Sequence, residues 1–208
     1  MAQMYDITPT MRPALQPWPG DSPLSREVLL ELARGDAVTL STMRCSVHLG
    51  AHADAPSHYG RDGRSIEHQP LDRYIGPCQL MHINAPRGVR IGVDHLTAPV
   101  TQPRLLLATG TFPDPEIWND DFAALEPALV DHLHEQGVVL VGIDTPSVDL
   151  MSSKDLPAHA RFLAHDMAIL EGLVLRDMPA GVYELIALPL KLEGFDASPV
   201  RAVLRAGP

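Results

Sequence analysis

Four side chains that can bind a metal ion or move a proton lie within one short stretch: His48, His52, Asp54 and His58. All four occupy even positions, and in an extended chain successive side chains alternate between faces, so this spacing aims them the same way. Full extension would place His48 about 20 Å from Asp54, too far for two ligands of one ion at ~2 Å each. We therefore expect the chain to fold back near Gly50.

Two histidines and one carboxylate suit zinc or a similar divalent ion with an open coordination position. Zinc lowers the pKa of a bound water to about 7, so hydrolysis is the natural chemistry. His58 follows Asp54 across Pro56, and we assign it to proton transfer rather than to metal binding. A helical spacing of His48 and His52 stays open, as does a polar turn with purely structural histidines.

Short elements must position these residues, because the chain contains 20 prolines and 15 glycines. Hydrophobic periodicity predicts strands at residues 5–8, 38–47, 78–83, 104–109, 138–143, 183–190 and 199–204, and helices at 25–34 and 122–136. A proline-rich irregular loop joins the first strand to the first helix. We expect an α/β fold with a twisted sheet core and a few flanking helices, and residues 1–208 show no internal domain boundary.

Charge and composition narrow the function classes. The chain has 26 acidic against 16 basic residues and a formal net charge of −10, which disfavours nucleic acid and anionic membranes as partners. Cys45 and Cys78 are too few for a disulfide framework, so any metal relies on nitrogen and oxygen ligands. No apolar run approaches the ~20 residues of a membrane span, and the first residues lack a signal-peptide pattern. We expect a cytoplasmic protein.

The pattern His-x-Gly-x-His-x-Asp-x-Pro-x-His, from His48 to His58, resembles the signature of the metal-dependent cyclase-like hydrolases, and most closely that of bacterial kynurenine formamidases. The similarity extends to Tyr-Asp-Ile-Thr near the start, Trp18-Pro-Gly-Asp, Gly-Ile-Asp-Thr-Pro-Ser-Val-Asp from Gly142, and Ile-Leu-Glu-Gly-Leu around Glu171. One departure is Ala51, where many members carry threonine. Alanine supplies no hydroxyl for hydrogen bonding to a ligand, which does not alter the expected reaction class.

The resemblance implies a swivelling β/β/α fold, a homodimer and two zinc ions per subunit. The resemblance implies that His48, His52 and Asp54 are ligands of the first ion. Asp54 and Glu171 would bridge both ions, and His159 would complete the second. His58 would be the general acid/base and Trp18 the aromatic residue that stacks on the substrate. That substrate would be N-formyl-L-kynurenine, hydrolysed to L-kynurenine and formate in tryptophan degradation.

The two distal ligands impose a test on the fold. His159 and Glu171 would be about 18 Å apart along one continuous α-helix and would point in different directions. Both can reach one ion only if the helix breaks between them. His165 is a rival to His159 that the spacing alone does not exclude.

Several other readings stay open. Trp18 can be a packing anchor for its loop or a substrate contact. Asp144, Ser147 and Asp149 follow an apolar strand and are either turn-forming or functional. An isatin-type cyclic amide with manganese is an alternative to the formamide substrate, and a metal-binding module without catalysis is an alternative to an enzyme.

Overall fold

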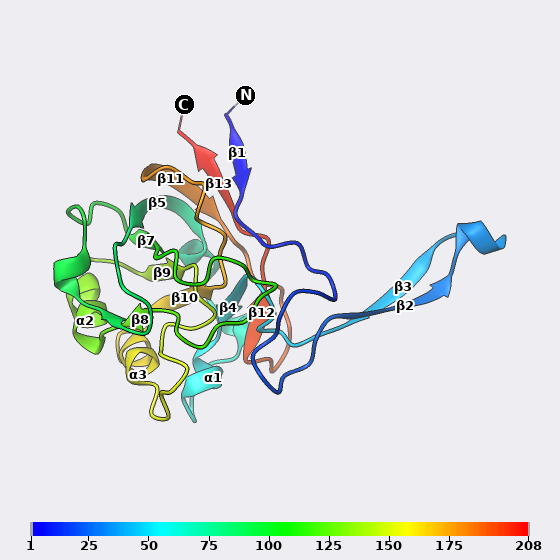
Figure 1. Ribbon diagram of the computed structural model, residues 1–208, viewed down its shortest axis with the longest axis horizontal. Helices are drawn as coiled ribbons and strands as arrows, with labels where there is room; N and C mark the ends of the chain where they lie inside the picture. The colour runs from blue at the N-terminus through cyan, green and yellow to red at the C-terminus, as the bar shows by residue number, and fades with distance from the viewer. Residues whose placement is uncertain (1, 208) are drawn as a thin grey trace.

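A nine-stranded mixed sheet forms the framework of the computed structural model, which describes residues 2–207 (Figure 1). In spatial order the strands are β1 (Met4–Asp6), β13 (Val203–Ala206), β11 (Gly181–Ile186), β5 (Ile75–His82), β7 (Arg104–Ala108), β9 (Leu140–Ile143), β10 (Ala168–Glu171), β4 (His52–Asp54) and β12 (Ala197–Pro199). The four strands β5, β7, β9 and β10 are parallel, and the strands on either side pair antiparallel. The expected α/β class is confirmed.

Hydrophobic clusters lie on both faces of this sheet, as expected for parallel strands that read as continuous apolar runs. Helices α2 (Pro127–Glu135) and α3 (Pro157–Ala164) cover one face through Leu129, Leu133 and Phe162. On the other face the curled sheet encloses a cluster that includes Ile7 and Leu106. The remaining elements are α1 (Pro56–Tyr59), the short parallel pair β6 (Arg90–Ile91) and β8 (Ala124–Leu125), and 3-10 turns at Leu32–Arg34, Ile66–His68, Leu71–Arg73 and Val93–His95.

A two-stranded arm projects far from this body (Figure 1). It consists of β2 (Ser25–Leu30) paired antiparallel with β3 (Leu40–Arg44), and nearly every residue of both strands is exposed. The helix predicted for residues 25–34 is therefore wrong. An amphipathic helix needs a core for its apolar stripe, and the arm lies outside the core, so pairing with β3 satisfies the backbone of this segment instead.

Other boundaries differ from the prediction for local reasons. The helix predicted at residues 122–136 begins only at Pro127, because proline favours the first helical turn and the preceding residues pair as β8. The strand predicted at 199–204 divides into parts of β12 and β13. Within residues 2–207 no helix is long and apolar enough to cross a membrane.

Candidate metal centre and its pocket

Strand β4 carries two of the proposed ligands on one face. His52 and Asp54 alternate with Ala53, whose side chain is fully buried on the opposite face. The chain folds back just before β4, as the reach of His48 required, and Gly50 adopts a left-handed φ of 70° there. A Cβ atom on Gly50 would lie 3.0 Å from the Leu15 side chain, so the turn also needs the small residue.

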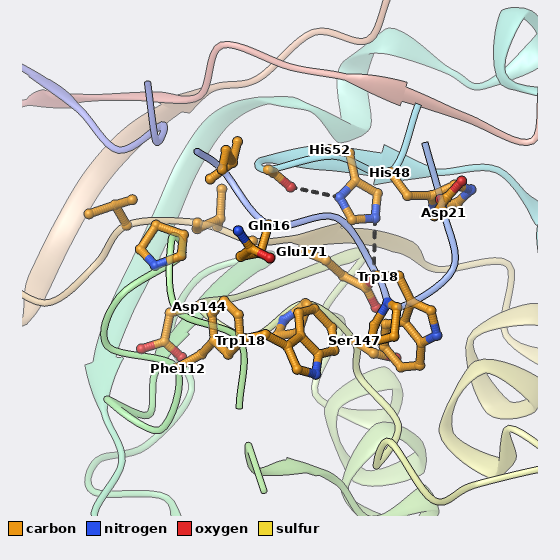
Figure 2. Close-up of a pocket in the computed structure, with 18 of the residues that line it drawn as sticks. Gln16, Trp18, Asp21, His48, His52, Phe112, Trp118, Asp144, Ser147 and Glu171 are labelled. Carbon is orange, nitrogen blue, oxygen red and sulfur yellow. Dashed lines mark hydrogen bonds and ion pairs between the residues drawn. The ribbon is translucent and has the colours of Figure 1, made fainter. Parts of the chain in front are cut away.

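Strand β10 pairs with β4 and brings Glu171 directly opposite His52. The His52 Nε2 atom lies 3.2 Å from Glu171 Oε2, and the His52 Nδ1–H donates a hydrogen bond of 2.9 Å to the Gly50 carbonyl (Figure 2). Glu171 Oε1 accepts a hydrogen bond from the Val148 backbone N–H at 2.7 Å. The turn before β4 thus holds His52, and the loop after β9 holds Glu171.

His159 reaches the same point from helix α3. Its Nε2 atom lies 3.5 Å from Asp54 Oδ2 and 3.6 Å from Glu171 Oε1. The break required between His159 and Glu171 is present, since α3 ends at Ala164 and β10 begins at Ala168. His165, the rival, lies 2.7 Å from Asp131 Oδ1 and stacks on His134, so it belongs to a different cluster.

His48 and His58 complete the cluster on the exposed side. His48 Nδ1 lies 3.1 Å from Asp54 Oδ1, and its Nε2 lies 2.9 Å from Asp196 Oδ2. His58, on α1, has its ring centre 4.2 Å from that of His48 and its Nδ1 atom 3.5 Å from Asp196 Oδ2. Two sets could each hold an ion, His48–Asp54–His58 and His52–Asp54–Glu171, with ligand atoms within 4.8 Å of one another in each set.

Unsatisfied polar atoms show that this cluster fits a cation. Both carboxylate oxygens of Asp54 and the His52 Nε2 atom are buried without a hydrogen-bond partner of good geometry in residues 2–207. Such groups cost about 1–3 kcal/mol each when left unsatisfied. Because all three face the same space, a divalent ion bound there would satisfy them together.

The pKa values of the clustered histidines and of Asp54 also indicate a site that stabilises positive charge. Burial alone would lower the pKa of His52, yet the attraction of the nearby Asp54 and Glu171 carboxylates outweighs that effect and raises its pKa to about 10. Burial likewise opposes the carboxylates around His159, which raise its pKa to about 10. The pKa of Asp54 is lowered despite burial, because three histidines surround its carboxylate. These carboxylates stabilise positive charge at the positions where ions would sit.

Two carboxylates outside the predicted ligand set hold the histidines in place. Asp149 Oδ2 accepts a 2.9 Å hydrogen bond from His159 Nδ1–H, and its other oxygen accepts a 2.7 Å bond from Arg90. Although burial opposes it, these hydrogen bonds lower the pKa of Asp149 to about 2. Asp196, between His48 and His58, has the same relation to the first set of ligands, and the sequence analysis missed it.

Asp144 and Ser147, the other two candidates after β9, lie at different positions and are not among the predicted metal ligands. The Asp144 carboxylate is buried and accepts hydrogen bonds from the Thr109 hydroxyl at 2.7 Å and the Gly110 backbone N–H at 2.8 Å. Burial raises the pKa of Asp144. The carboxylate therefore ties the end of β9 to the end of β7, whereas Ser147 lines the pocket above the ligands.

An aromatic-walled pocket of about 490 Å³ opens above the cluster, with His48, His52, His58, His159 and Glu171 at its floor. Figure 2 shows Trp18, Phe112 and Trp118 along one wall, opposite His52. Trp18 meets Trp118 edge-on, with ring centres 5.4 Å apart. Trp18 is thus both a packing partner and a pocket wall, while Trp118 was not anticipated because nothing in its local sequence links it to the site.

The fold and site define a class, the α/β metal-dependent hydrolases. A solved protein described as a "potential metal-dependent hydrolase with cyclase activity" is 26% identical with a TM-score of 0.85, and each chain is covered completely. A predicted metal-dependent hydrolase from Bacillus stearothermophilus is also 26% identical, with a TM-score of 0.83 and complete coverage of both chains. Isatin hydrolase A from Ralstonia solanacearum shares the fold, at 23% identity and a TM-score of 0.80 over 99% of this chain and 92% of its own.

A match to a family model identifies the family of the chain. The Cyclase model, described as "Putative cyclase", matches residues 5–150, which is more than half of the chain. The chain belongs to this cyclase family. The matched range includes the stretch from His48 to His58, and Glu171 and His159 follow it on β10 and α3.

Proposed function

We propose that the chain is a metal-dependent amide hydrolase that converts N-formyl-L-kynurenine and water to L-kynurenine and formate. The observation that carries the proposal is the meeting of four side chains around the buried Asp54 carboxylate at the floor of an aromatic-walled pocket: His48, His52, His159 and Glu171. A volume of about 490 Å³ suits a single-ring substrate with a short side chain. The motifs flanking the histidine signature add the resemblance to the formamidases.

The proposed cofactor is zinc, at two ions per subunit. His48, His52 and Asp54 would hold one ion, and Asp54, Glu171 and His159 the other. Bound divalent ions supply Lewis acidity for the formyl carbonyl and for the attacking water.

The protein's own residues orient the substrate and move the proton. The edge of the Trp18–Trp118 pair offers an apolar wall for the aryl ring, which would direct the formamide group toward the histidines. His58 is half-exposed beside the ligands and would donate a proton to the departing aniline nitrogen as the C–N bond breaks.

A second candidate keeps the site and changes the substrate to an isatin-type cyclic amide with manganese. The shared fold with an isatin hydrolase favours it, and the pocket volume of about 490 Å³ also suits a small fused-ring substrate. A chain that only binds metal is the third candidate.

One metal-stripped preparation decides among the three. It would be reloaded with zinc or with manganese, analysed for metal content, and assayed with N-formyl-L-kynurenine and with isatin. Formate release by the zinc-loaded protein supports the formamidase, whereas ring opening of isatin alone supports the second candidate. Tight metal binding without hydrolysis of either compound, or of any formanilide, contradicts both enzymes.

A cytoplasmic homodimer is part of the same proposal. Cys45 and Cys78 are both free thiols, which suits a reducing compartment. The exposed β2–β3 arm is the element best placed to contact a second copy of the chain.

A further inference from the structure

Arg176 stands out among the residues that line the pocket. Within the described residues it is the only lysine or arginine in the lining, and its side chain is exposed. It also borders a smaller hollow that contains Arg12 and Glu116, and there Arg12 is already paired with Glu116. None of the side-chain hydrogen bonds or ion pairs within residues 2–207 involves the Arg176 guanidinium.

The acidic side chains of the same pocket already have partners. Asp144 accepts hydrogen bonds from Thr109 and Gly110, and Glu171 faces His52 and the Val148 N–H. Asp21 accepts the backbone N–H of the next residue. None of these carboxylates pairs with Arg176, so its guanidinium is free to bind an anionic group that enters the pocket.

The backbone that carries Arg176 is fixed relative to the ligands. Gly172 and Leu173 donate hydrogen bonds to the Thr145 and Ile143 carbonyls, and Val174 donates to the Ile7 carbonyl at 2.9 Å. The buried Leu173 and Leu175 anchor the segment to the core. Arg176 follows Glu171 by five positions, so the two Cα atoms are at most about 17 Å apart.

We propose that Arg176 is a binding subsite for the carboxylate of the substrate, which its planar guanidinium can hold through two parallel hydrogen bonds. This inference rests on the proposed function and names the substrate class within it: aryl formamides that bear an anionic side chain. In N-formyl-L-kynurenine the carboxylate lies about seven covalent bonds, roughly 9 Å, from the formyl carbon. The substrate would thus span the pocket between the histidines and Arg176.

The subsite would also determine the direction in which the substrate enters the pocket. A carboxylate is itself a good ligand for divalent ions, so a substrate with a formamide at one end and a carboxylate at the other can enter in two directions. A guanidinium at the rim holds the carboxylate away from the floor and leaves the formamide to face His58.

The first test compares N-formyl-L-kynurenine with its methyl ester, which keeps the shape and removes the charge. The wild type should prefer the acid, and Arg176→Gln should lower the ratio of the two kcat/KM values about 10–100-fold, mainly through KM for the acid. Arg176→Lys should retain an intermediate ratio, because lysine keeps the charge without the paired hydrogen bonds. Arg61→Gln removes the same charge from an exposed site outside the pocket and should leave the ratio unchanged.

A binding measurement separates this inference from the proposed function. Calorimetry would compare L-kynurenine with its methyl ester on the wild type and on Arg176→Gln. A preference for the acid that disappears in the variant supports the subsite even if no formate is released. Equal binding of acid and ester by the wild type, or an unchanged preference in Arg176→Gln, overturns the subsite while leaving the formamidase intact.

Discussion

His58 differs from the other histidines of the cluster in its exposure. Its side chain is 35% exposed, whereas His52 and His159 are almost completely buried. A histidine that reaches both solvent and the pocket can exchange protons, which a buried ligand cannot do readily.

Replacement of His58 by alanine should leave the metal content unchanged, because His48, His52 and Asp54 remain to hold the first ion. It should lower turnover of N-formyl-L-kynurenine by ~10²-fold or more. Metal analysis and steady-state kinetics on the same preparation measure both effects. His68→Ala, at an exposed histidine on a 3-10 turn, is the matched control and should retain full turnover. A His58 variant with wild-type rates would make this residue structural only.

Asp149 should affect the affinity for metal rather than proton transfer. Its carboxylate accepts the Nδ1–H of His159, which leaves Nε2 as the atom that faces Asp54 and Glu171. Loss of such a partner typically weakens metal binding 10–100-fold.

Asp149→Asn should accordingly weaken binding of one ion per subunit by about 10–100-fold, measured by competition with chelators of graded affinity. Asp155→Asn, on an exposed residue of the same loop, should bind both ions normally. Equal affinity in the two variants would mean that Asp149 serves only to hold the start of α3.

The contrast between Asp196 and the ligands explains which residues of the site could be predicted from the sequence. His48, His52 and Asp54 are close in sequence, so their spacing alone suggested a shared site. Asp196 lies 148 residues from its partner His48, and only the pairing of β12 with β4 brings the two together. Contacts of this kind arise from the tertiary fold and leave no local pattern in the sequence.

At the scale of elements, the turn before β4 and the end of β10 meet at a single glycine. A Cβ atom on Gly172 would lie 2.3 Å from the Gly50 carbonyl oxygen, and the φ of Gly172 is 66°. The close approach sets the position of His52, two residues after Gly50, against Glu171, the residue before Gly172.

Gly172→Ala should lower the free energy of unfolding by about 3 kcal/mol, combining about 1 kcal/mol for the left-handed backbone with the clash against Gly50. Gly137→Ala isolates the first effect, because Gly137 has a φ of 82° with nothing within 4 Å of an added Cβ, and should cost about 1 kcal/mol. Denaturant unfolding of both variants gives the comparison. Equal losses would show that the chain relaxes around the contact.

Asp166 stabilises the connection between α3 and β10. It has a left-handed φ of 51° and forms ion pairs of 2.6 Å with both Arg64 and Arg73. The hydrogen bonds from Arg73 and Arg64 outweigh partial burial and lower the pKa of Asp166. A carboxyl group with a lowered pKa in the folded state stabilises the fold above its unfolded pKa of 3.8, and this contribution is lost as the pH falls through the folded value.

Asp166→Asn keeps a residue that tolerates the left-handed region and removes the charge. At pH 7 it should cost about 1 kcal/mol, since the pairs are half-exposed and screened. The difference from the wild type should shrink as the pH drops below about 4. Urea titrations across pH 3–7 measure the free energy of unfolding of both proteins. A difference that stays constant with pH would contradict the prediction. As a control, Asp62→Asn, on an exposed loop, should change the free energy of unfolding little at any pH.

Elements that belong to the core were easier to predict than the arm. Strands β7 and β9 lie within the apolar runs that predicted them, and β5 overlaps its run but begins three residues earlier. Strands buried on both faces have continuous apolar runs, which are easy to recognise in the sequence. Residues 25–34 contain apolar side chains at helical spacing, yet the segment has no core beneath it. Apolar residues at helical spacing indicate that one face of a segment is to be buried, but this spacing does not show which part of the protein would cover that face.

At the scale of the whole molecule, contacts within a single chain do not explain why the β2–β3 arm exposes so many apolar side chains. Five of its apolar side chains are 49–62% exposed: Leu29, Leu32, Val38, Leu40 and Met43. A two-stranded hairpin alone is at best marginally stable in water. Residues 22–46 contain three arginines and three acidic residues, so the arm bears none of the chain's net charge of −10 and can approach an equally acidic second copy without net repulsion.

A second copy also supplies enough surface. Burying these side chains would remove on the order of 500 Å² per arm, and two arms in a symmetric dimer would reach roughly 1,000 Å², the lower range of specific interfaces. Leu188, Leu190 and Phe195 are exposed on the segment that precedes β12, the sheet edge on the side from which the arm leaves the body (Figure 1). Each copy thus has both an apolar arm and an apolar strip, which favours a twofold exchange of arms.

The double substitution Leu40→Thr and Met43→Thr tests this dimer, because threonine keeps the strand propensity of β3 while removing apolar surface. Light scattering should give twice the chain mass for the wild type and the chain mass for the double variant. Val182→Thr changes an equally exposed residue of β11 in the main sheet and should remain dimeric. Leu190→Glu should dissociate the dimer from the receiving side. A monomeric wild type, or a double variant that stays dimeric, would show that the arm does not join two copies of this chain.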